Sequence, residues 1–303
     1  MNLLGKFWVF VRPFTLLVPA IGMVSGALIA LGAEPRWVSD WTDRPESIWW
    51  RIGLGALMAA TLNAASNGIN QVYDIEVDRI NKPQRLLPAG LMTLREAWTI
   101  VLVCFALAWL QAWWISRDCF WLVLAASFLT TIYSAPPLRT KQHGFWANIT
   151  VAIPRGTLLC VAGWSCVKNV ERLEPWWIGA VYGLYFLGAV TTKDFSDLEG
   201  DRLNGCRTLP VIFGVRKTVY IIAPFFVFPF LLIPIGVFAG VLTGNSTGLL
   251  LVGMVLPVWG AYIAYLLLKR PEELGGTENH VSWKHMYLLT LFAQAGFAIC
   301  YLT

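Results

Sequence analysis

Long apolar runs recur along almost the whole chain and limit what it can fold into. A helix that crosses a lipid bilayer needs roughly 20 mostly apolar residues, and nine segments have this character. They cover residues 13–32, 52–73, 97–116, 119–136, 147–167, 175–192, 219–242, 247–268 and 286–302. The composition, with 57% hydrophobic and only 14% charged residues, is too apolar for an ordinary soluble domain. The sequence therefore predicts an all-α fold in which residues 1–303 form a single membrane bundle of nine transmembrane helices.

The distribution of Lys and Arg between these runs predicts the orientation of the bundle. With the N-terminus in the cytoplasm, the cytoplasmic segments carry 16 of these residues and the opposite side carries 6. The net charge of +5 is ordinary for a membrane protein and gives no reason to expect nucleic acid as a partner. We therefore expect a multi-pass protein with a cytoplasmic N-terminus and a lipid bilayer as its surroundings.

An acidic segment occurs twice, once after the second apolar run and once after the sixth. Residues 70–88 and 194–210 form this pseudo-repeat, with DIEVDRIN at 74–81 and DLEGDRLN at 197–204. The pattern Arg-x-Leu-Pro follows a few residues later in both copies. Two pairs of carboxylates therefore lie at the ends of two predicted membrane helices, on the same cytoplasmic side.

Within each copy, the spacing of most acidic residues places their side chains on one face of a helix. Side chains three or four residues apart lie on the same side of a helix. Glu76 and Glu199 follow an aspartate by two residues, so they point elsewhere and are not expected to be ligands. The aligned residues are Asn70, Asp74 and Asp78 in the first copy and Asp194, Asp197 and Asp201 in the second.

Clustered aspartates at the end of a membrane span need a compensating cation or a polar cavity, because ionised groups are costly at membrane depth. We predict a divalent-metal site formed by Asp74, Asp78, Asp197 and Asp201. Two Mg²⁺ ions would neutralise these four carboxylates and could still coordinate an oxygen-rich anion, a role that a diphosphate fits. Each acidic stretch taken alone could be a solvated loop; the matching copies favour the metal site.

Basic residues are available to bind the phosphate oxygens and to stabilise a departing diphosphate. Each of them could instead anchor the protein at the cytoplasmic surface. Arg12 begins the first span and Arg155 lies inside the fifth, where a charge is costly and so suggests function, although Arg155 could instead pair with an aspartate structurally. The other candidates are Lys82, Arg85, Arg139, Lys141, Lys193 and Arg207.

Together these motifs resemble the UbiA superfamily of intramembrane prenyltransferases. Residues 70–78 match the NxxxDxxxD motif of this family, and residues 193–201 match its second DxxxD motif with the upstream Lys-Asp. Residues 133–137 resemble its YSxPP segment, and Arg12-Pro13 is similar to the motif at its first helix. The resemblance covers nearly the whole chain.

The resemblance implies nine transmembrane helices around a central cavity, capped by the loops between helices two and three and between helices six and seven. It implies transfer of a prenyl group from a prenyl diphosphate to an acceptor. By motif match, Asn70, Asp74, Asp78, Asp197 and Asp201 would hold Mg²⁺ and diphosphate, and Arg12, Lys82, Arg139 and Lys141 would contact phosphate. Tyr133 and Ser134 match positions that line the diphosphate pocket. The candidate catalytic residues are Asp194, Tyr133 and Arg155, with Asp194 as a base or a group that orients the acceptor.

The acceptor is less constrained than the donor. Asn70-Gln71 and residues 193–201 are similar to aromatic prenyltransferases of the homogentisate type, which favours an aromatic acceptor. Residues 83–90 and 207–210 are also similar to the branches that act on a glycerophosphate lipid or a tetrapyrrole carboxylate. A secondary transporter is the alternative from another class, but the aspartates lie at span ends beside phosphate-binding cations, which favours an enzyme.

Overall fold

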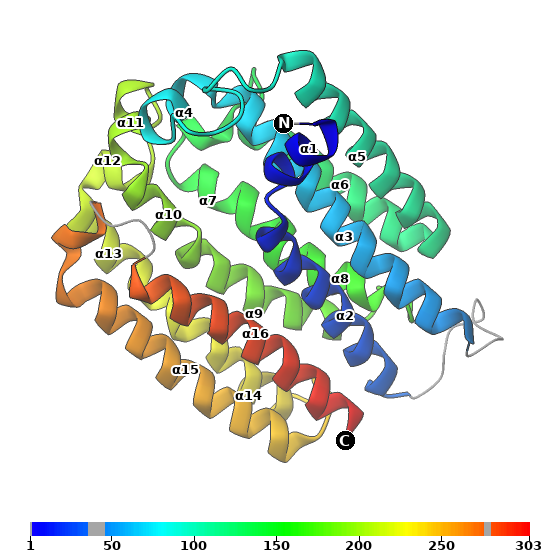
Figure 1. The fold of residues 1–303 in the computed structure, drawn as a ribbon. Helices are drawn as coiled ribbons and strands as arrows, with labels where there is room; N and C mark the ends of the chain where they lie inside the picture. Colours follow the sequence, from blue (N-terminus) through cyan, green and yellow to red (C-terminus); the bar gives the residue numbers. More distant parts are fainter. Residues whose placement is uncertain (1, 36–45, 276–279) are drawn as a thin grey trace.

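The described part of the chain is built from helices. A computed structural model describes residues 2–35, 46–275 and 280–303. Within these ranges the regular elements are all helical, and the one departure is an isolated β-bridge between His143 and Arg207 (Figure 1). The prediction of an all-α fold is confirmed.

Seven long helices make up most of the bundle. They are α2 (Leu17–Gly32), α3 (Glu46–Tyr73), α5 (Leu94–Ile115), α6 (Arg117–Ser134), α9 (Leu173–Ala189), α15 (Ser246–Lys269) and α16 (Val281–Leu302). Two further runs consist of shorter helices joined end to end. The first contains α7 (Phe145–Ala152), η3 (Ile153–Leu158) and α8 (Leu159–Trp164), and the second contains α13 (Val215–Ile222), η4 (Ala223–Phe226), η5 (Phe228–Leu231) and α14 (Leu232–Phe238).

Short helices connect the long ones. Of these, α1, α4, α11 and α12 lie toward the upper end of the bundle in Figure 1. The short elements are α1 (Leu3–Val11), η1 (Pro13–Leu16), α4 (Ile75–Asn81), η2 (Thr140–Gln142), α10 (Thr191–Ser196), α11 (Leu198–Leu203), α12 (Leu209–Phe213) and η6 (Pro271–Gly275).

The helices have the length and apolarity of membrane spans. Seven of the nine predicted spans have this length and apolarity. The other two, 119–136 and 175–192, fall on α6 and α9, which are shorter at 18 and 17 residues. The protein is an integral, multi-pass membrane protein. The seven stretches in the described ranges that are long and apolar enough to cross a bilayer are Pro13–Gly32, Ile48–Tyr73, Leu94–Ile115, Phe145–Trp164, Val215–Phe238, Ser246–Lys269 and Val281–Leu302.

Prolines interrupt two of the predicted spans. Pro154 is the second residue of a π-helical turn, η3, between α7 and α8, and Pro224 and Pro229 lie in the 3₁₀ turns η4 and η5 between α13 and α14. Proline has no backbone N–H and its ring clashes with the preceding turn, so it breaks the regular hydrogen-bond pattern. Both runs therefore depart from a regular α-helix at these turns.

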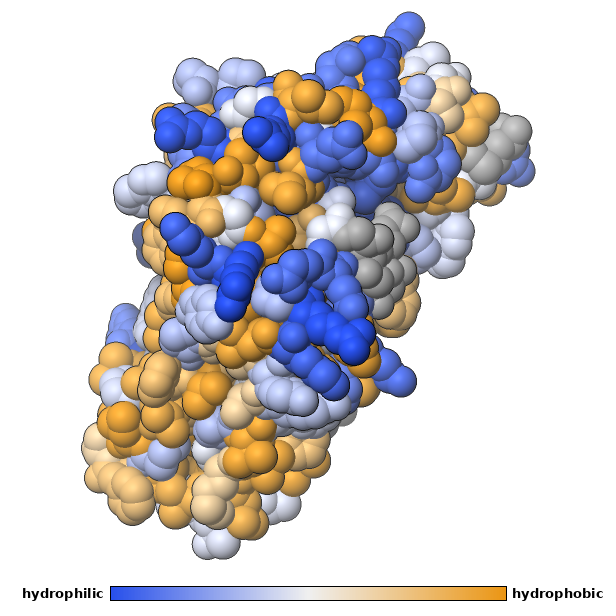
Figure 2. Space-filling model, turned by 90° about the vertical axis from the view of Figure 1, so that its left-hand side faces the viewer, coloured by the Kyte–Doolittle hydropathy of each residue, from blue (hydrophilic) through white to orange (hydrophobic). Residues whose placement is uncertain are grey.

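Small residues let the central helices pack closely. A Cβ atom on Gly26 of α2 would lie 2.5 Å from the Cys160 carbonyl oxygen, and one on Gly163 of α8 would lie 2.4 Å from the Met23 carbonyl oxygen. Helices in a membrane associate largely through such backbone contact. On the outside, apolar side chains dominate the lower part of the view in Figure 2, whereas hydrophilic ones gather above, at the end where α11 and α12 lie.

Candidate functional site

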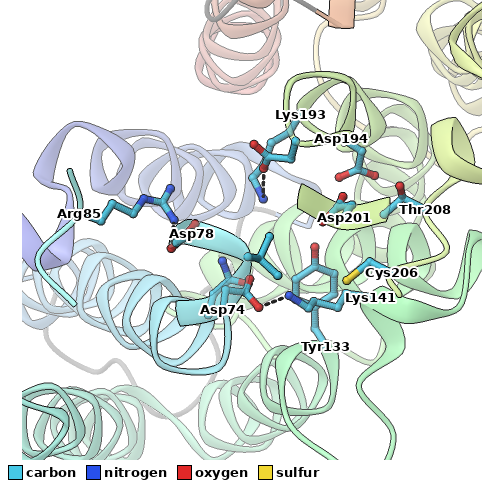
Figure 3. Close-up of a pocket in the computed structure, with 13 residues that line it drawn as sticks. Asp74, Asp78, Arg85, Tyr133, Lys141, Lys193, Asp194, Asp201, Cys206 and Thr208 are labelled. Atoms are coloured by element: carbon cyan, nitrogen blue, oxygen red, sulfur yellow. Dashed lines mark hydrogen bonds and ion pairs between the residues drawn. The ribbon is translucent and has the colours of Figure 1, made fainter. Parts of the chain in front are cut away.

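The two acidic segments meet in one pocket, although more than 100 residues separate them in the chain. The first copy reaches this pocket from the end of α3 and from α4, and the second reaches it from α10 and α11 (Figure 3). Its lining consists of Asn70, Asp74, Val77, Asp78, Arg85, Tyr133, Lys141, Lys193, Asp194, Asp197, Asp201, Cys206 and Thr208. The structure thus brings together ten of the residues that the sequence singled out.

Both copies present their aspartates through the same backbone feature. Asp74 lies at a break between α3 and α4, with φ −104°, and Asp197 lies at the corresponding break between α10 and α11, with φ −98°. Hydrogen bonds between residues four apart continue across each break, from the Asp78 N–H to the Asp74 carbonyl (2.7 Å) and from the Asp201 N–H to the Asp197 carbonyl (2.9 Å). Each copy therefore offers two carboxylates one helical turn apart.

Three of the four predicted metal ligands are paired with basic side chains. The partners include Lys82, which follows the first copy in sequence but binds the second, so the two copies are joined electrostatically. Among the described residues, the negative charge of these three is balanced from within the protein. The pairs are Asp74 with Lys141 and with Arg139 (3.6 Å), Asp78 with Arg85 (2.5 Å), and Asp197 with Lys82 (2.5 Å) and Lys193 (3.5 Å).

The other two carboxyl groups, Asp194 and Asp201, make no ion pair or side-chain hydrogen bond with a described residue. Burial raises the pKa of Asp201 to about 6 and that of Asp194 to about 8, while nearby Lys193 opposes both shifts. For Asp197, burial acts in the same direction, but Lys193 and Lys82 outweigh it and lower the pKa. Asp194 and Asp201 are therefore the carboxyl groups of the pocket that basic side chains compensate least.

The pocket residues fit a hard metal ion and an oxyanion. Across the described ranges, no three His, Cys, Asp or Glu side chains converge closely enough to form a ready-made metal centre. Five aspartates nevertheless line one pocket, and carboxylate oxygens are the ligands that Mg²⁺ prefers. Among the described residues, two buried polar atoms lack a hydrogen-bond partner, Thr208 Oγ1 in the lining and Arg139 Nε next to Asp74, which points to a ligand.

The remaining predicted residues divide into two groups. Lys82, Ser134 and Arg139 do not line the pocket but contact residues that do; the Ser134 hydroxyl, for example, donates to Asn70 Oδ1 (3.3 Å). In contrast, no hydrogen bond or ion pair with a described residue involves the side chains of three arginines. These are Arg12, Arg155 and Arg207, and none of them lines the pocket.

Arg207 differs from its counterpart in the first copy. Arg85 pairs with Asp78, whereas the backbone N–H of Arg207 bonds to the Gln142 carbonyl (3.3 Å) beside the bridge to His143. The repeat predicts equal roles for the two arginines, and the structure gives them different ones. Glu76 and Glu199, which were expected to point away, are both exposed and lie outside the pocket.

Comparison with known proteins identifies the family. A model of the UbiA prenyltransferase family matches residues 16–278. The chain belongs to the UbiA prenyltransferase family. This match confirms the resemblance drawn from the acidic motifs, and it confirms the prediction of a prenyltransferase.

Relatives in this family have different named activities. The chain is 32% identical over 233 residues to probable homogentisate phytyltransferase 2 from Oryza sativa, covering 73% of this chain but only 58% of that protein. It is 29% identical over 291 residues to digeranylgeranylglyceryl phosphate synthase from Thermococcus gammatolerans, covering 96% of this chain and 97% of that one. The match thus extends over nearly all of the archaeal relative and less than two thirds of the plant one.

Solved structures of UbiA proteins share the fold. A UbiA homolog from Archaeoglobus fulgidus bound to DMAPP and Mg²⁺ superposes with a TM-score of 0.72 at 18% identity, over 98% of this chain and 99% of that one. A structure from work on digeranylgeranylglyceryl phosphate synthase in membranes gives a TM-score of 0.73 at 22% identity, over 100% and 99% of the two chains.

Three pocket residues were not anticipated from the sequence: Val77, Cys206 and Thr208. Thr208 could have been predicted from the sequence as a pocket residue, because it occupies a position at which the two UbiA motif copies differ. The repeated Arg-x-Leu-Pro pattern has Leu86 at the variable position of the first copy and Thr208 in the second. Leu86 is buried in an apolar cluster, whereas Thr208 offers a hydroxyl to the pocket.

A single asparagine connects the two motif copies through hydrogen bonds. Asn81, the last residue of α4, accepts from the Gly200 N–H (3.0 Å) and donates to the Asp197 carbonyl (3.2 Å). A Cβ atom on Gly200 would lie 2.4 Å from the Asn81 side chain, so only glycine allows this approach. The equivalent Asn204 instead bonds to the Gly200 carbonyl in its own copy (2.8 Å).

We expect Asn81→Ala to lower the melting temperature more than Asn204→Ala. The first change removes two hydrogen bonds between the copies, and each such bond contributes about 0.5–1.5 kcal/mol, whereas the second removes one bond within a copy. Fluorescence-detected size-exclusion chromatography after heating would measure both variants. Equal melting temperatures for Asn81→Ala and the unmodified protein would contradict a role for Asn81 in joining the copies.

Proposed function

We propose that this protein transfers a prenyl group from a prenyl diphosphate to a membrane-associated acceptor in an Mg²⁺-dependent reaction that releases diphosphate. The observation that carries this proposal is the single pocket in which two acidic segments face each other among basic side chains. The family match supports prenyl transfer. The fold shared with a homolog bound to DMAPP and Mg²⁺ supports this donor class and this ion.

In this proposal the aspartates hold the metal. Asp74, Asp78, Asp197 and Asp201 would bind two Mg²⁺ ions, which offset the charge of the diphosphate when bound. Around them, basic groups bind the phosphate oxygens and stabilise the charge that develops as diphosphate departs. These groups are Arg85, Lys141 and Lys193 in the lining, with Lys82 and Arg139 bonded to it.

The chemical step separates charge inside the bundle. The bond between prenyl C1 and the diphosphate oxygen breaks, and its electron pair leaves with the diphosphate. An electron-rich carbon of the acceptor then forms a bond to C1 and loses a proton, for which Asp194 in the pocket wall is our candidate base. The Tyr133 hydroxyl projects between the two acidic copies (Figure 3), and an aromatic ring at this point can stabilise a neighbouring cation.

We also propose that α6 and α9 cross the membrane, which gives nine spans around a central cavity. The excess of Lys and Arg on one side supports a cytoplasmic N-terminus and an active site that faces the cytoplasm. On this topology the segments after α3 and α9, which carry the two acidic motifs, cap the cavity. Diphosphate would then be released into the cytoplasm.

For the acceptor we favour an aromatic compound of the homogentisate type, as the relative from Oryza sativa supports. O-prenylation of a glycerophosphate lipid is the second candidate, because the match to the Thermococcus gammatolerans synthase spans nearly its full length. Transfer to a chlorophyllide-type carboxylate is a further alternative, supported by a match of 29% identity to chlorophyll synthase from Arabidopsis thaliana.

A product assay tests the proposal. Purified protein in lipid nanodiscs would be given geranylgeranyl or phytyl diphosphate, Mg²⁺, and either homogentisate or geranylgeranylglyceryl phosphate, with products identified by mass. We expect a prenylated aromatic product and free diphosphate, and no product once EDTA removes Mg²⁺. A lipid ether as the sole product would overturn the preferred acceptor, and folded protein that is inactive with every pair would contradict prenyl transfer.

A further inference from the structure

One hydroxyl group in the pocket has no partner in the protein. Thr208 is 5% exposed and lines the pocket, and no described residue makes a hydrogen bond with its Oγ1 atom. Its side chain projects toward the carboxyl groups of Asp194 and Asp201 (Figure 3). A buried hydroxyl that loses its hydrogen bonds to water and gains none in return destabilises the folded protein. A ligand that enters the pocket would supply the missing partner.

The place of Thr208 in the chain makes this lack of a partner unexpected. Thr208 is the N-cap residue of α12, and a threonine there ordinarily accepts a hydrogen bond from the N–H of the second or third helical residue. In α12 the second residue is Pro210, which has no N–H, and the third is Val211. The Thr208 side chain makes no capping hydrogen bond. Its hydroxyl faces the pocket and not the end of its own helix.

The other helix caps show that this arrangement belongs to the pocket. In the described helices, the N-cap residues with a Ser, Thr, Asn or Asp side chain divide into two groups. Those outside the pocket each accept a hydrogen bond from their own helix; they are Asn2, Thr93, Ser116 and Asn245. Those that make no capping bond all line the pocket; they are Asp74, Asp197 and Thr208. The two aspartates pair with basic side chains instead, whereas Thr208 has no such partner.

Backbone hydrogen bonds hold Thr208 in place from both sides. On one side, the N–H of the preceding residue, Arg207, bonds to the Gln142 carbonyl of η2 (3.3 Å). On the other side, the Thr208 carbonyl accepts from the Ile212 N–H of α12 (3.0 Å). The segment η2 also contributes Lys141 to the pocket. The hydroxyl is therefore presented by a backbone that is already fixed, which favours binding because little ordering is left to occur.

The two motif copies differ at this point in the group that they offer. In the first copy, Arg85 lines the pocket and pairs with Asp78 (2.5 Å). In the second copy, the corresponding Arg207 is outside the pocket, and Thr208 lies in the lining with Asp201, the counterpart of Asp78. A hydroxyl donates one hydrogen bond and carries no charge. Thr208 can thus bind an anionic oxygen without neutralising Asp201, which stays available to a metal ion.

We propose that the Thr208 hydroxyl donates a hydrogen bond to a terminal phosphate oxygen of the prenyl diphosphate. This inference rests on the proposed function. Hydrogen bonds to an ionised oxygen are stronger than those between neutral groups. The bond also strengthens as negative charge develops on the departing diphosphate. Thr208 is thereby a residue that binds and positions the donor from the side of the second acidic copy, where Arg207 does not reach the pocket.

The variant Thr208→Val tests the proposal, because valine has nearly the same shape as threonine and lacks the hydroxyl. The probe is geranylgeranyl S-thiolodiphosphate, a donor analogue that resists cleavage, titrated calorimetrically into the purified protein with Mg²⁺. We expect its Kd to rise roughly tenfold or more, because a hydrogen bond to a charged group is lost. Inorganic diphosphate should show the same loss, since the contact is to the headgroup. Thr208→Ser keeps the hydroxyl and should recover most of the affinity.

The stability of the ligand-free protein separates binding from a structural role. The melting temperature of Thr208→Val should equal or exceed that of the unmodified protein, because an unpaired buried hydroxyl is removed and no hydrogen bond is lost. As a matched control, Thr218→Val removes a buried hydroxyl of α13 that donates to the Gly214 carbonyl (2.8 Å), outside the pocket. This control should leave the Kd of the analogue unchanged.

Two results would overturn the inference and leave the proposed function standing. The first is an equal Kd for Thr208→Val and the unmodified protein with both probes. The second is a smaller rise in melting temperature for Thr208→Val with Mg²⁺ alone, which would assign the hydroxyl to the metal ion and not to the phosphate. If the unmodified protein bound neither probe in the presence of Mg²⁺, the proposed donor site would be wrong, and this inference with it.

Discussion

Replacing Asp74 or Asp197 by asparagine is expected to lower kcat/KM for prenyl transfer by roughly 10²–10³-fold or more, the scale on which loss of one charge-stabilising group acts. Asparagine keeps the size of the side chain and removes its charge. Both aspartates are buried at the breaks between consecutive helices, and each is the first carboxylate of its DxxxD pair. Steady-state assays with Mg²⁺ and saturating acceptor would measure the loss.

The repeat itself supplies matched controls for this prediction. Glu76→Gln and Glu199→Gln remove the same charge two residues further along each copy. Glu76 is an exposed partner of Arg79 (2.7 Å), and exposed ion pairs contribute only about 0–1 kcal/mol. We expect both glutamine variants to keep their activity. If either glutamine variant lost as much kcat/KM as Asp74→Asn, activity would depend on the net charge at this end of the bundle and not on the positions of the aspartates.

The sequence could predict that the acidic residues of each segment lie on one helix face, because this depends only on their spacing along the chain. Residues four apart share a helix face whatever else the chain does, so Asp74 and Asp78 were expected to point the same way, and both line the pocket. The meeting of the two copies depends on which helices pack together, which no local pattern specifies. The contacts from Asn81 to Gly200 and from Lys82 to Asp197 belong to this second kind.

The sequence repeat also gave a wrong expectation where the two copies have different surroundings in the structure. Arg207 matches Arg85 in sequence, but its backbone N–H bonds to the carbonyl of the distant Gln142, whereas that of Arg85 bonds to the nearby Lys82 carbonyl (3.0 Å). Hydropathy located membrane helices by their composition. It could not show that the break at Pro154 takes the form of a π-helical turn, or that this turn packs against α9. Arg155 was noticed in the sequence as an unusual charge within a predicted span, and the structure places it in η3.

Lys141→Met is expected to destabilise the metal-free protein by up to about 3–5 kcal/mol, the usual cost of removing one member of a buried ion pair, because Arg139 at 3.6 Å compensates the Asp74 carboxylate only in part. Lys141 and Asp74 are 5% and 7% exposed, so water replaces the lost contact only poorly. Mg²⁺ can replace it if Asp74 is a metal ligand. The rise in melting temperature on adding Mg²⁺ to EDTA-treated protein should then be larger for Lys141→Met than for the unmodified protein.

Two further variants make this expectation specific. Lys217→Met, at an exposed lysine of α13, removes the same charge and should change neither the melting temperature nor its response to Mg²⁺. Adding Asp74→Asn to Lys141→Met should restore stability in EDTA and abolish the extra response to Mg²⁺, because the unpaired carboxylate is then gone. If the double variant still gains the extra stability from Mg²⁺, the ion binds elsewhere and Asp74 is not its ligand.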